Sequence, residues 1–342
     1  MTLADDVLNG SRRALARALT LVENGGAGAD EILTALFPRT GQAWIIGVTG
    51  APGTGKSSLV NALAKAYRAE AKTVAIVAVD PTSPFSGGAI LGDRIRMRDL
   101  SGDSGVFIRS MATRGSLGGL ARTTRDVMRV LDAAGYDIIL VETVGAGQSE
   151  VDIARAAQTT LVVEAPGLGD DVQAIKAGIL EIADILVVNK ADRPGADNTV
   201  RGLRAMLELG HPAAKSQMIS HHGQMMKVQS AAHSNDQPLW LPPVIRTVAT
   251  ADKAAGVETG IGELIEAITA HRRFLETAGM ADQLERSRME IELYDRLQNA
   301  LMARLLATVG EDRLSEILAR IQARELDPHR AVLLILEGQE IA

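Results

Sequence analysis

Seven short apolar runs, separated by segments with helical periodicity, dominate the centre of the chain. They are rich in Val, Ile and Leu, and most are apolar throughout instead of alternating with polar residues. Strands of this kind are buried on both faces, as in a parallel sheet covered by helices. We therefore predict an α/β fold with a mostly parallel sheet flanked by helices. The predicted strands are Trp44–Thr49, Thr73–Asp80, Val106–Ser110, Tyr136–Thr143, Thr159–Ala165, Ile185–Asn189 and Val244–Val248.

Helical patterns lie on both sides of this region. Near the N-terminus, Leu15, Leu19 and Val22 share one helix face, and Ser11 can cap that helix. After Gly260 the pattern is helical to the end of the chain. We therefore divide the chain into an N-terminal helical extension (1–40), a central domain (41–275) and a C-terminal helical region (276–342).

A long helix is predicted over residues 281–308, and its apolar positions recur at steps of three, four and seven residues. Such a helix can pack on its own domain or serve as a dimerisation arm, and the pattern alone does not decide between the two. These apolar positions are Leu284, Ile291, Tyr294, Leu297, Leu301 and Leu305.

Composition narrows the class of protein. The 342 residues, 46% of them hydrophobic, suffice for one large α/β domain with appended helices. A net charge of −6 argues against nucleic acid as a partner, because phosphate backbones are bound by basic surfaces. Cysteine is absent, which excludes disulfides and cysteine nucleophiles. No apolar run reaches the roughly 18–20 residues that span a bilayer. With no signal or transit peptide pattern either, we expect a cytoplasmic protein without a membrane partner.

Residues 210–242 are polar and contain His211, His221, His222 and His233. Their spacing matches no metal-ligand pattern that we can defend. We interpret this segment as an irregular excursion with solvent-exposed histidines, and a metal site is the weaker alternative.

A phosphate-binding motif follows the first predicted strand. It matches G-x-x-x-x-G-K-[ST], in which glycines let backbone N–H groups wrap a phosphate closely. The lysine supplies charge to the β- and γ-phosphates, and the serine hydroxyl can ligate Mg²⁺. The helix that follows points its N-terminus at the same anion. The residues expected to bind nucleotide here are Gly50, Ala51, Pro52, Gly53, Thr54, Gly55, Lys56, Ser57 and Ser58.

A second motif, N-K-x-D, begins at the end of the predicted strand Ile185–Asn189. The carboxylate of Asp192 can accept two hydrogen bonds from guanine N1–H and N2–H₂, a donor pair that adenine lacks. Because charged hydrogen bonds contribute roughly 1.5–3 kcal/mol each, the pair can favour guanine by roughly two or more orders of magnitude. Asn189 and Lys190 would brace the base and the phosphate loop. An aspartate that caps a helix is the alternative, but with the phosphate motif upstream the pattern predicts GTP as the substrate.

Three carboxylates, Asp80, Asp93 and Glu142, stand where Mg²⁺ can be held. Mg²⁺ keeps several waters and takes few protein carboxylates, so all three cannot be direct ligands. We expect Ser57 to bind the ion directly and the carboxylates to act partly through water.

Two irregular loops adjoin these carboxylates and are candidate switches, although each can also be a surface turn. Residues 81–92 join Asp80 to Asp93, and residues 144–150 follow Glu142. Loops of this kind can be ordered by γ-phosphate and Mg²⁺ and released on hydrolysis. Gln148 can orient the attacking water, but its spacing from the strand does not establish this. The catalytic candidates are Lys56, Asp93, Glu142 and Gln148.

A third loop, residues 166–171, precedes a helix that carries Gln173 and Lys176. Asp170 can be the N-cap of that helix or a functional residue, and the residues alone do not decide.

Together these segments resemble the MeaB/MMAA/ArgK-type GTPases, chaperones of adenosylcobalamin-dependent acyl-CoA mutases. Their order and spacing are far more specific than the phosphate motif alone. The segments that carry the resemblance are GVTGAPGTGKSSL (47–59), AVDPTSPFSGGAILGDRIRM (78–97), FIRSMATRGSLGGLA (107–121), ILVETVGAGQSE (139–150), APGLGDDVQAIKAGILEIADI (165–185) and VNKAD (188–192).

The resemblance implies a P-loop G domain with helical extensions and a homodimer held by the C-terminal part. It places Asp80, Asp93 and Glu142 around Mg²⁺ and the γ-phosphate. It also assigns Asp170, Gln173 and Lys176 to a third switch that faces the mutase. GTP binding and hydrolysis would then gate the loading of adenosylcobalamin into the mutase and help to remove inactivated cofactor. The G protein itself is not expected to hold cobalamin as a prosthetic group.

Two other classes of function are weighed against this one. An ATPase or kinase coupled to amino-acid transport needs adenine acceptance, which Asp192 opposes, and a membrane partner. A nickel-delivery GTPase depends on His or Cys ligands, and this chain has no cysteine and no ordered histidine cluster.

Overall fold

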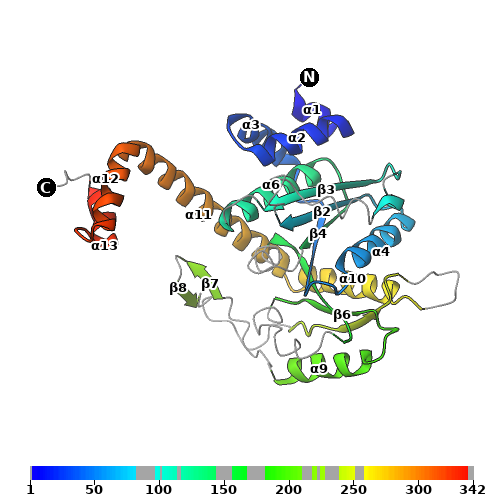
Figure 1. Cartoon of the computed structure of the whole chain (residues 1–342). Helices are drawn as coiled ribbons and strands as arrows, with labels where there is room; N and C mark the ends of the chain where they lie inside the picture. The colour runs from blue at the N-terminus through cyan, green and yellow to red at the C-terminus, as the bar shows by residue number, and fades with distance from the viewer. Residues whose placement is uncertain are drawn as a thin grey trace. The chain divides into compact units, whose positions relative to one another are not determined.

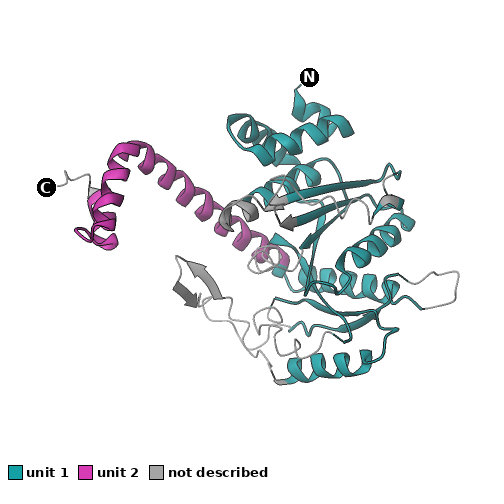
Figure 2. Cartoon of the chain, viewed as in Figure 1, with its two compact units in different colours: residues 1–280 teal, residues 281–342 magenta. Residues whose placement is uncertain are grey.

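The computed structural model describes residues 2–81, 97–100, 102–113, 117–143, 156–167, 182–209, 218–221, 224–227, 239–250 and 258–337. The chain forms two compact units, Met1–Met280 and Ala281–Ala342 (Figure 1, Figure 2). The prediction of three parts, 1–40, 41–275 and 276–342, stays a prediction.

The first unit is built on a sheet in which every described pairing is parallel, in the order β3-β2-β4-β1-β5-β6-β9. Each of the seven predicted strands is present, and the predicted fold class is confirmed. The strands are β1 (Trp44–Thr49), β2 (Val74–Pro81), β3 (Val106–Thr113), β4 (Ile138–Thr143), β5 (Thr159–Glu164), β6 (Ile185–Asn189) and β9 (Val244–Thr247).

Helices cover both faces of this sheet. Helix α4 (Lys56–Ala69) packs on β1, β2 and β4 and on helix α10 (Ile261–Thr277). Helix α6 (Leu117–Ala133) packs on β4 and on the N-terminal helices (Figure 1). Helix α9 (Ala196–Leu209) covers β6, with Val200 and Leu203 in a core that includes Leu186 and Val188. Burial on both faces explains why the strands are apolar throughout.

The N-terminal helices α1 (Leu3–Leu8), α2 (Arg12–Asn24) and α3 (Ala27–Leu36) belong to the core of the first unit. Leu19 and Ile32 share one hydrophobic cluster with Leu131 of α6 and Ile139 of β4. As predicted, Ser11 caps α2, and its hydroxyl accepts a hydrogen bond from the N–H of Ala14. These helices are therefore held to the sheet by the same burial that stabilises the sheet itself.

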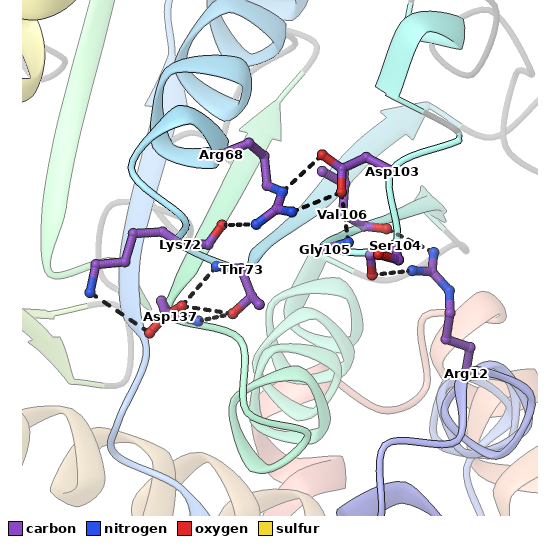
Figure 3. Close-up of polar contacts among 9 residues, drawn as sticks. All are labelled: Arg12, Arg68, Lys72, Thr73, Asp103, Ser104, Gly105, Val106 and Asp137. Atoms are coloured by element: carbon purple, nitrogen blue, oxygen red, sulfur yellow. Dashed lines mark hydrogen bonds and ion pairs between the residues drawn. The ribbon is translucent and has the colours of Figure 1, made fainter.

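Two arginine side chains join helix α2 to strand β3 and the residues before it. Arg109 of β3 donates two hydrogen bonds to Glu23 of α2, at 2.6 and 2.8 Å, and both side chains are largely buried. Arg12 donates to the carbonyl oxygens of Ser104 and Val106, each at 2.7 Å (Figure 3). Because a guanidinium requires acceptors in fixed directions, these contacts set the angle at which α2 meets β3.

The loops that lead into β2, β3 and β4 are joined by a second polar network (Figure 3). Arg68 pairs with Asp103 through hydrogen bonds of 2.9 and 3.0 Å. These hydrogen bonds hold the pKa of Asp103 below its ordinary value, and the N–H of Gly105 adds to the effect. Burial acts to raise the pKa of Asp137, but hydrogen bonds from Thr73 outweigh it and leave that pKa lowered.

One part of the segment 210–242 differs from the expectation. Strand β7 (Met218–His221) pairs antiparallel with β8 (Gln224–Lys227), so the interpretation of this segment as irregular is wrong at these residues. Runs of four mixed residues are too short to show the alternation of a strand. His211, His222 and His233 lie outside the described residues. Where side chains are described, no group of three or more His, Asp or Glu could hold a metal.

The second unit is helical, with α11 (Met280–Val309), α12 (Glu311–Gln322) and α13 (Pro328–Glu337). It contains a small cluster of Ile317, Leu326 and Ala331. The long predicted helix is confirmed as α11. Among the helices that the structure describes, none combines the length and apolarity needed to cross a membrane.

Candidate active site

Parallel strands bring their carboxyl ends to one edge of the sheet, and both sequence motifs begin there. Residue Val48 of β1 lies beside Glu142 of β4, and β6 ends at Asn189. In open α/β sheets this is the edge at which ligands bind. The register therefore gathers the phosphate motif, Glu142 and the N-K-x-D motif at one place.

The phosphate loop, residues 50–55, is shaped by glycines at two close approaches. Gly50 has φ +137°, and a Cβ there would lie 2.1 Å from the carbonyl oxygen of Val163 in β5. Gly55 has φ +92°, and a Cβ there would lie 2.5 Å from Nδ2 of Asn189. Side chains are therefore excluded at both positions, by backbone conformation and by space.

Lys56 and Ser57 open helix α4 and are both buried, at 6% and 8% exposure. The ammonium of Lys56 donates to the carbonyl oxygens of Gly50 and Ala51, at 2.8 and 3.0 Å. The loop thus curls around its own lysine, next to the N–H groups of the first turn of α4. A helix N-terminus with a neighbouring ammonium is a strong anion site.

Glu142 and Ser57 meet directly. The hydroxyl of Ser57 donates to Oε1 of Glu142 at 2.6 Å, and Glu142 is 5% exposed. Behind this pair, the hydroxyl of Thr143 donates to that of Thr49 at 3.2 Å, where both side chains are fully buried. Two buried hydroxyl contacts therefore join the end of β1 and the start of α4 to the end of β4.

Asn189 connects three segments of the edge. Its Nδ2 donates to the carbonyl oxygens of Thr54 and Gly55, at 2.9 and 3.4 Å. Its Oδ1 accepts from the hydroxyl of Thr247 and the N–H of Ala249, both at 3.2 Å. Thr247 was not predicted from the sequence. The available signal was its position at the end of the last strand, at the same edge as Asn189.

Lys190 and Asp192 complete the second motif. Lys190 adopts a left-handed conformation with φ +56°, and its ammonium donates to the carbonyl oxygen of Gly53 at 2.6 Å. Asp192 is exposed, so its carboxylate is open to a ligand. The structure therefore brings Asn189 and Lys190, the first two residues of the N-K-x-D motif, to the phosphate loop.

Five other predicted site residues cannot be compared with the structure. Asp93, Gln148, Asp170, Gln173 and Lys176 lie outside the described residues. The backbone of Asp80 is described in β2, two positions beyond Ala78, which pairs with Glu142.

A parallel sheet whose first strand runs into G-x-x-x-x-G-K-S and then into a helix defines a P-loop nucleotide hydrolase. Residues 15–309 match the family model described as "Methylmalonyl Co-A mutase-associated GTPase MeaB". The chain belongs to this family and is a GTPase, and the predicted resemblance is confirmed.

Similar proteins support the assignment over nearly the full chain. A relative from Pyrococcus abyssi is 47% identical, over 98% of this chain and 95% of its own length. GTPase ArgK of Escherichia coli is 33% identical, over 98% of this chain and 96% of its own length. A solved structure of a protein named "LAO/AO transport system kinase" matches with a TM-score of 0.67 and 25% identity, over 98% of this chain and 96% of its own.

Proposed function

We propose that this GTPase is a metallochaperone for an adenosylcobalamin-dependent acyl-CoA mutase. It would couple GTP binding and hydrolysis to the loading, protection and reactivation of the mutase. The observation that carries the proposal is the match of residues 15–309 to a family described by its association with methylmalonyl-CoA mutase. The client can be a methylmalonyl-, isobutyryl-, ethylmalonyl- or 2-hydroxyisobutyryl-CoA enzyme.

In this proposal the phosphate loop and α4 bind the phosphates of GTP. Lys56 exchanges its contacts with the Gly50 and Ala51 carbonyls for the β- and γ-phosphates. Asp192, whose side chain is exposed, accepts the two guanine donors. Asn189 and Lys190 hold the base-binding segment at a fixed distance from the phosphate loop through their bonds to Thr54 and Gly53.

The Ser57–Glu142 pair fits Mg²⁺. A hydroxyl and a carboxylate, 2.6 Å apart and buried, are the oxygen donors that this ion prefers. Ser57 would hold the ion directly, and Glu142, with Asp80 and Asp93, would act partly through water. When bound, Mg²⁺ supplies positive charge to the phosphates. Glu142 would orient water molecules at this edge, and Gln148 would orient the attacking one.

Hydrolysis by the isolated protein should be slow. The segments 50–57 and 189–192 contain no arginine that could stabilise charge on the transferring phosphoryl group. Unassisted switch GTPases turn over far below one per second, and a supplied arginine accelerates them by about 10³–10⁵. We propose that the mutase raises the rate through the third switch, with Asp170, Gln173 and Lys176 at the contact.

We further propose a homodimer formed through the C-terminal helices. Helix α11 exposes apolar side chains at four-residue steps, with Leu293 65%, Leu297 49% and Leu301 58% exposed in the single chain. A continuous apolar strip of this kind on one helix is covered by a partner more often than by water.

GTP turnover with and without purified apo-mutases tests the chaperone proposal. We expect one cognate mutase to raise the rate well above that of the isolated protein, and GTP to change cofactor transfer into that mutase. The variant Lys56→Ala should abolish both effects. If none of the four mutase classes changes GTP turnover or binding, the chaperone role is refuted while the GTPase assignment stands.

The transport-kinase name of the solved relative favours one alternative, a kinase or ATPase of amino-acid transport. That function needs adenine binding. Thermal unfolding with GTP or ATP separates the two, because only the ligand that binds the folded state raises the unfolding temperature. Equal stabilisation by ATP would favour the alternative.

A further inference from the structure

Thr247 holds the N-K-x-D segment at two points without belonging to either sequence motif. It ends β9, lies opposite Asn189 in the register and is 1% exposed. Its hydroxyl contacts Oδ1 of Asn189 at 3.2 Å, and its carbonyl oxygen accepts from the N–H of Ala191 at 3.0 Å. The two bonds lie on either side of Lys190.

Lys190, which lies between these two bonds, has an unfavourable backbone conformation. Lys190 has φ +56°, a conformation that a residue with a Cβ rarely adopts and keeps only where its surroundings enforce it. Its ammonium reaches Gly53 from this conformation, at 2.6 Å. The bond between Lys190 and the phosphate loop therefore depends on the bonds that fix Asn189 and Ala191.

The chemistry of Asn189 fixes the direction of the contact with Thr247. The carbonyl oxygens of Thr54 and Gly55 only accept, so Nδ2 must face them, and the N–H of Ala249 only donates, so Oδ1 must face β9. The hydroxyl of Thr247 must then donate to Oδ1. A one-way series of hydrogen bonds runs from Thr247 through Asn189 to the phosphate loop.

We propose that Thr247 is a positioning residue for the guanine nucleotide, acting through the side chain of Asn189. This inference rests on the proposed base site at Asn189–Asp192. Without the hydroxyl, Lys190 leaves its left-handed conformation in part of the free protein. The apparent Kd then rises in inverse proportion to the fraction of the protein that stays competent to bind. A bound nucleotide restores the arrangement, so kcat stays unchanged.

The test compares Thr247→Val, which keeps the shape and removes the hydroxyl, with Thr247→Ser, which keeps the hydroxyl. Kd for a fluorescent GDP and KM and kcat for GTP are measured on the full chain. We expect Thr247→Val to raise Kd and KM about tenfold, the scale of one buried hydrogen bond, with kcat unchanged. Thr247→Ser should restore both values. Should the valine variant not fold, Thr247→Ala removes the same hydroxyl.

A matched control is Thr124→Val on α6. Thr124 is 2% exposed, and its hydroxyl has no hydrogen-bond partner among the described residues. The same change there should leave Kd and KM as they are. If Thr124→Val weakened GDP binding as much as Thr247→Val, the effect would reflect a general loss of packing in the protein. The inference would then be overturned.

A double-mutant cycle with Asn189→Ala tests whether Thr247 acts through the side chain of Asn189. If Thr247 acts through Asn189, Thr247→Val adds no further loss once the asparagine side chain is absent. Wild-type affinity in Thr247→Val, or a full additional loss in the double variant, overturns the inference. The base site itself is tested separately by Asp192→Asn. If Asp192→Asn keeps its preference for guanine, the proposed base site is refuted, independently of the results for Thr247.

Discussion

The Ser57 hydroxyl donates to Oε1 of Glu142 over 2.6 Å, and this bond joins the first turn of α4 to the end of β4. Both side chains are more than nine-tenths buried. A buried carboxylate needs donors of this kind, because burial has removed the water that would otherwise solvate its charge. A bound cation would take the place of the Ser57 proton as a partner of Glu142.

Ser57→Ala is expected to remove the effect of Mg²⁺ on nucleotide binding. Loss of one ligand or its support typically costs about 10–100-fold in metal affinity or activity. The measurement is Kd for GDP with Mg²⁺ and with EDTA, alongside GTP turnover. Thr269→Ala, which removes an exposed hydroxyl on α10 bonded locally to Ile265, serves as the control. A Mg²⁺ effect that survives in Ser57→Ala contradicts the assignment.

Gly55→Ala is expected to abolish nucleotide binding while the protein stays folded. The new Cβ would lie 2.5 Å from Nδ2 of Asn189, so the asparagine must move from the phosphate loop. Gly41→Ala is the matched control, because Gly41 has a similar φ of +91° with open space around its Cβ position. Isothermal titration with GDP should show binding in Gly41→Ala alone. Equal affinity in the two variants would mean that the Asn189 contact does not matter.

Asp192→Asn is expected to change the preferred base. An amide can donate to the 2-oxo group of xanthine, whereas it leaves one guanine donor without an acceptor. A site built for a hydrogen bond that the ligand lacks can discriminate by about 10⁴. Competition between GDP and XDP measures the ratio. Retention of guanine preference would place base recognition elsewhere.

The Arg68–Asp103 pair predicts a pH-dependent stability. Its hydrogen bonds lower the pKa of Asp103 in the folded state, so ionised Asp103 stabilises the fold. That contribution is fully present above the unfolded pKa of about 3.9 and is lost as pH falls through the folded value. Asp103→Asn should therefore unfold at a lower temperature than wild type at neutral pH, and the gap should close in acid. Circular dichroism melts across the pH range check this. A difference in unfolding temperature that does not change with pH would contradict this role of Asp103.

Leu297→Glu in α11 is expected to produce monomers. The leucine is 49% exposed in the single chain, and a carboxylate placed in a helix–helix seam loses its hydration without a partner. Light scattering after gel filtration gives the mass. Gln298→Glu, at an exposed polar position of the same helix, should leave the mass unchanged. If wild type is already monomeric, the proposed dimer is refuted.

The fold could be predicted from sequence because strands buried on both faces leave uninterrupted Val, Ile and Leu runs. Their ends were less predictable. Strand β3 continues to Thr113, beyond the apolar run, because it pairs with β2 over its full length. Strand β4 begins at Ile138, two residues later than predicted, and the carboxylate of Asp137 just before it accepts a hydrogen bond from the N–H of Thr73.

The motif residues of the site were predictable because each motif is local. Thr247 was not, since its bond to Asn189 spans 58 residues and arises only when β9 takes its place beside β6. Asp132 is a similar case. Its carboxylate accepts from the N–H groups of Gly41, Gln42 and Ala43, 89 to 91 residues away, and so shapes the entry to β1. Contacts of this length form only when distant segments pack together, and no local motif predicts which residues will then meet.

The shared cluster of Leu19, Ile32, Leu131 and Ile139 has a consequence for biosynthesis. The first helices leave the ribosome well before α6 and β4 have been translated, at about 5–20 residues per second. Their apolar faces stay uncovered for seconds in every nascent chain. We therefore expect this molecule to be open to aggregation during synthesis, when a holdase could cover these faces.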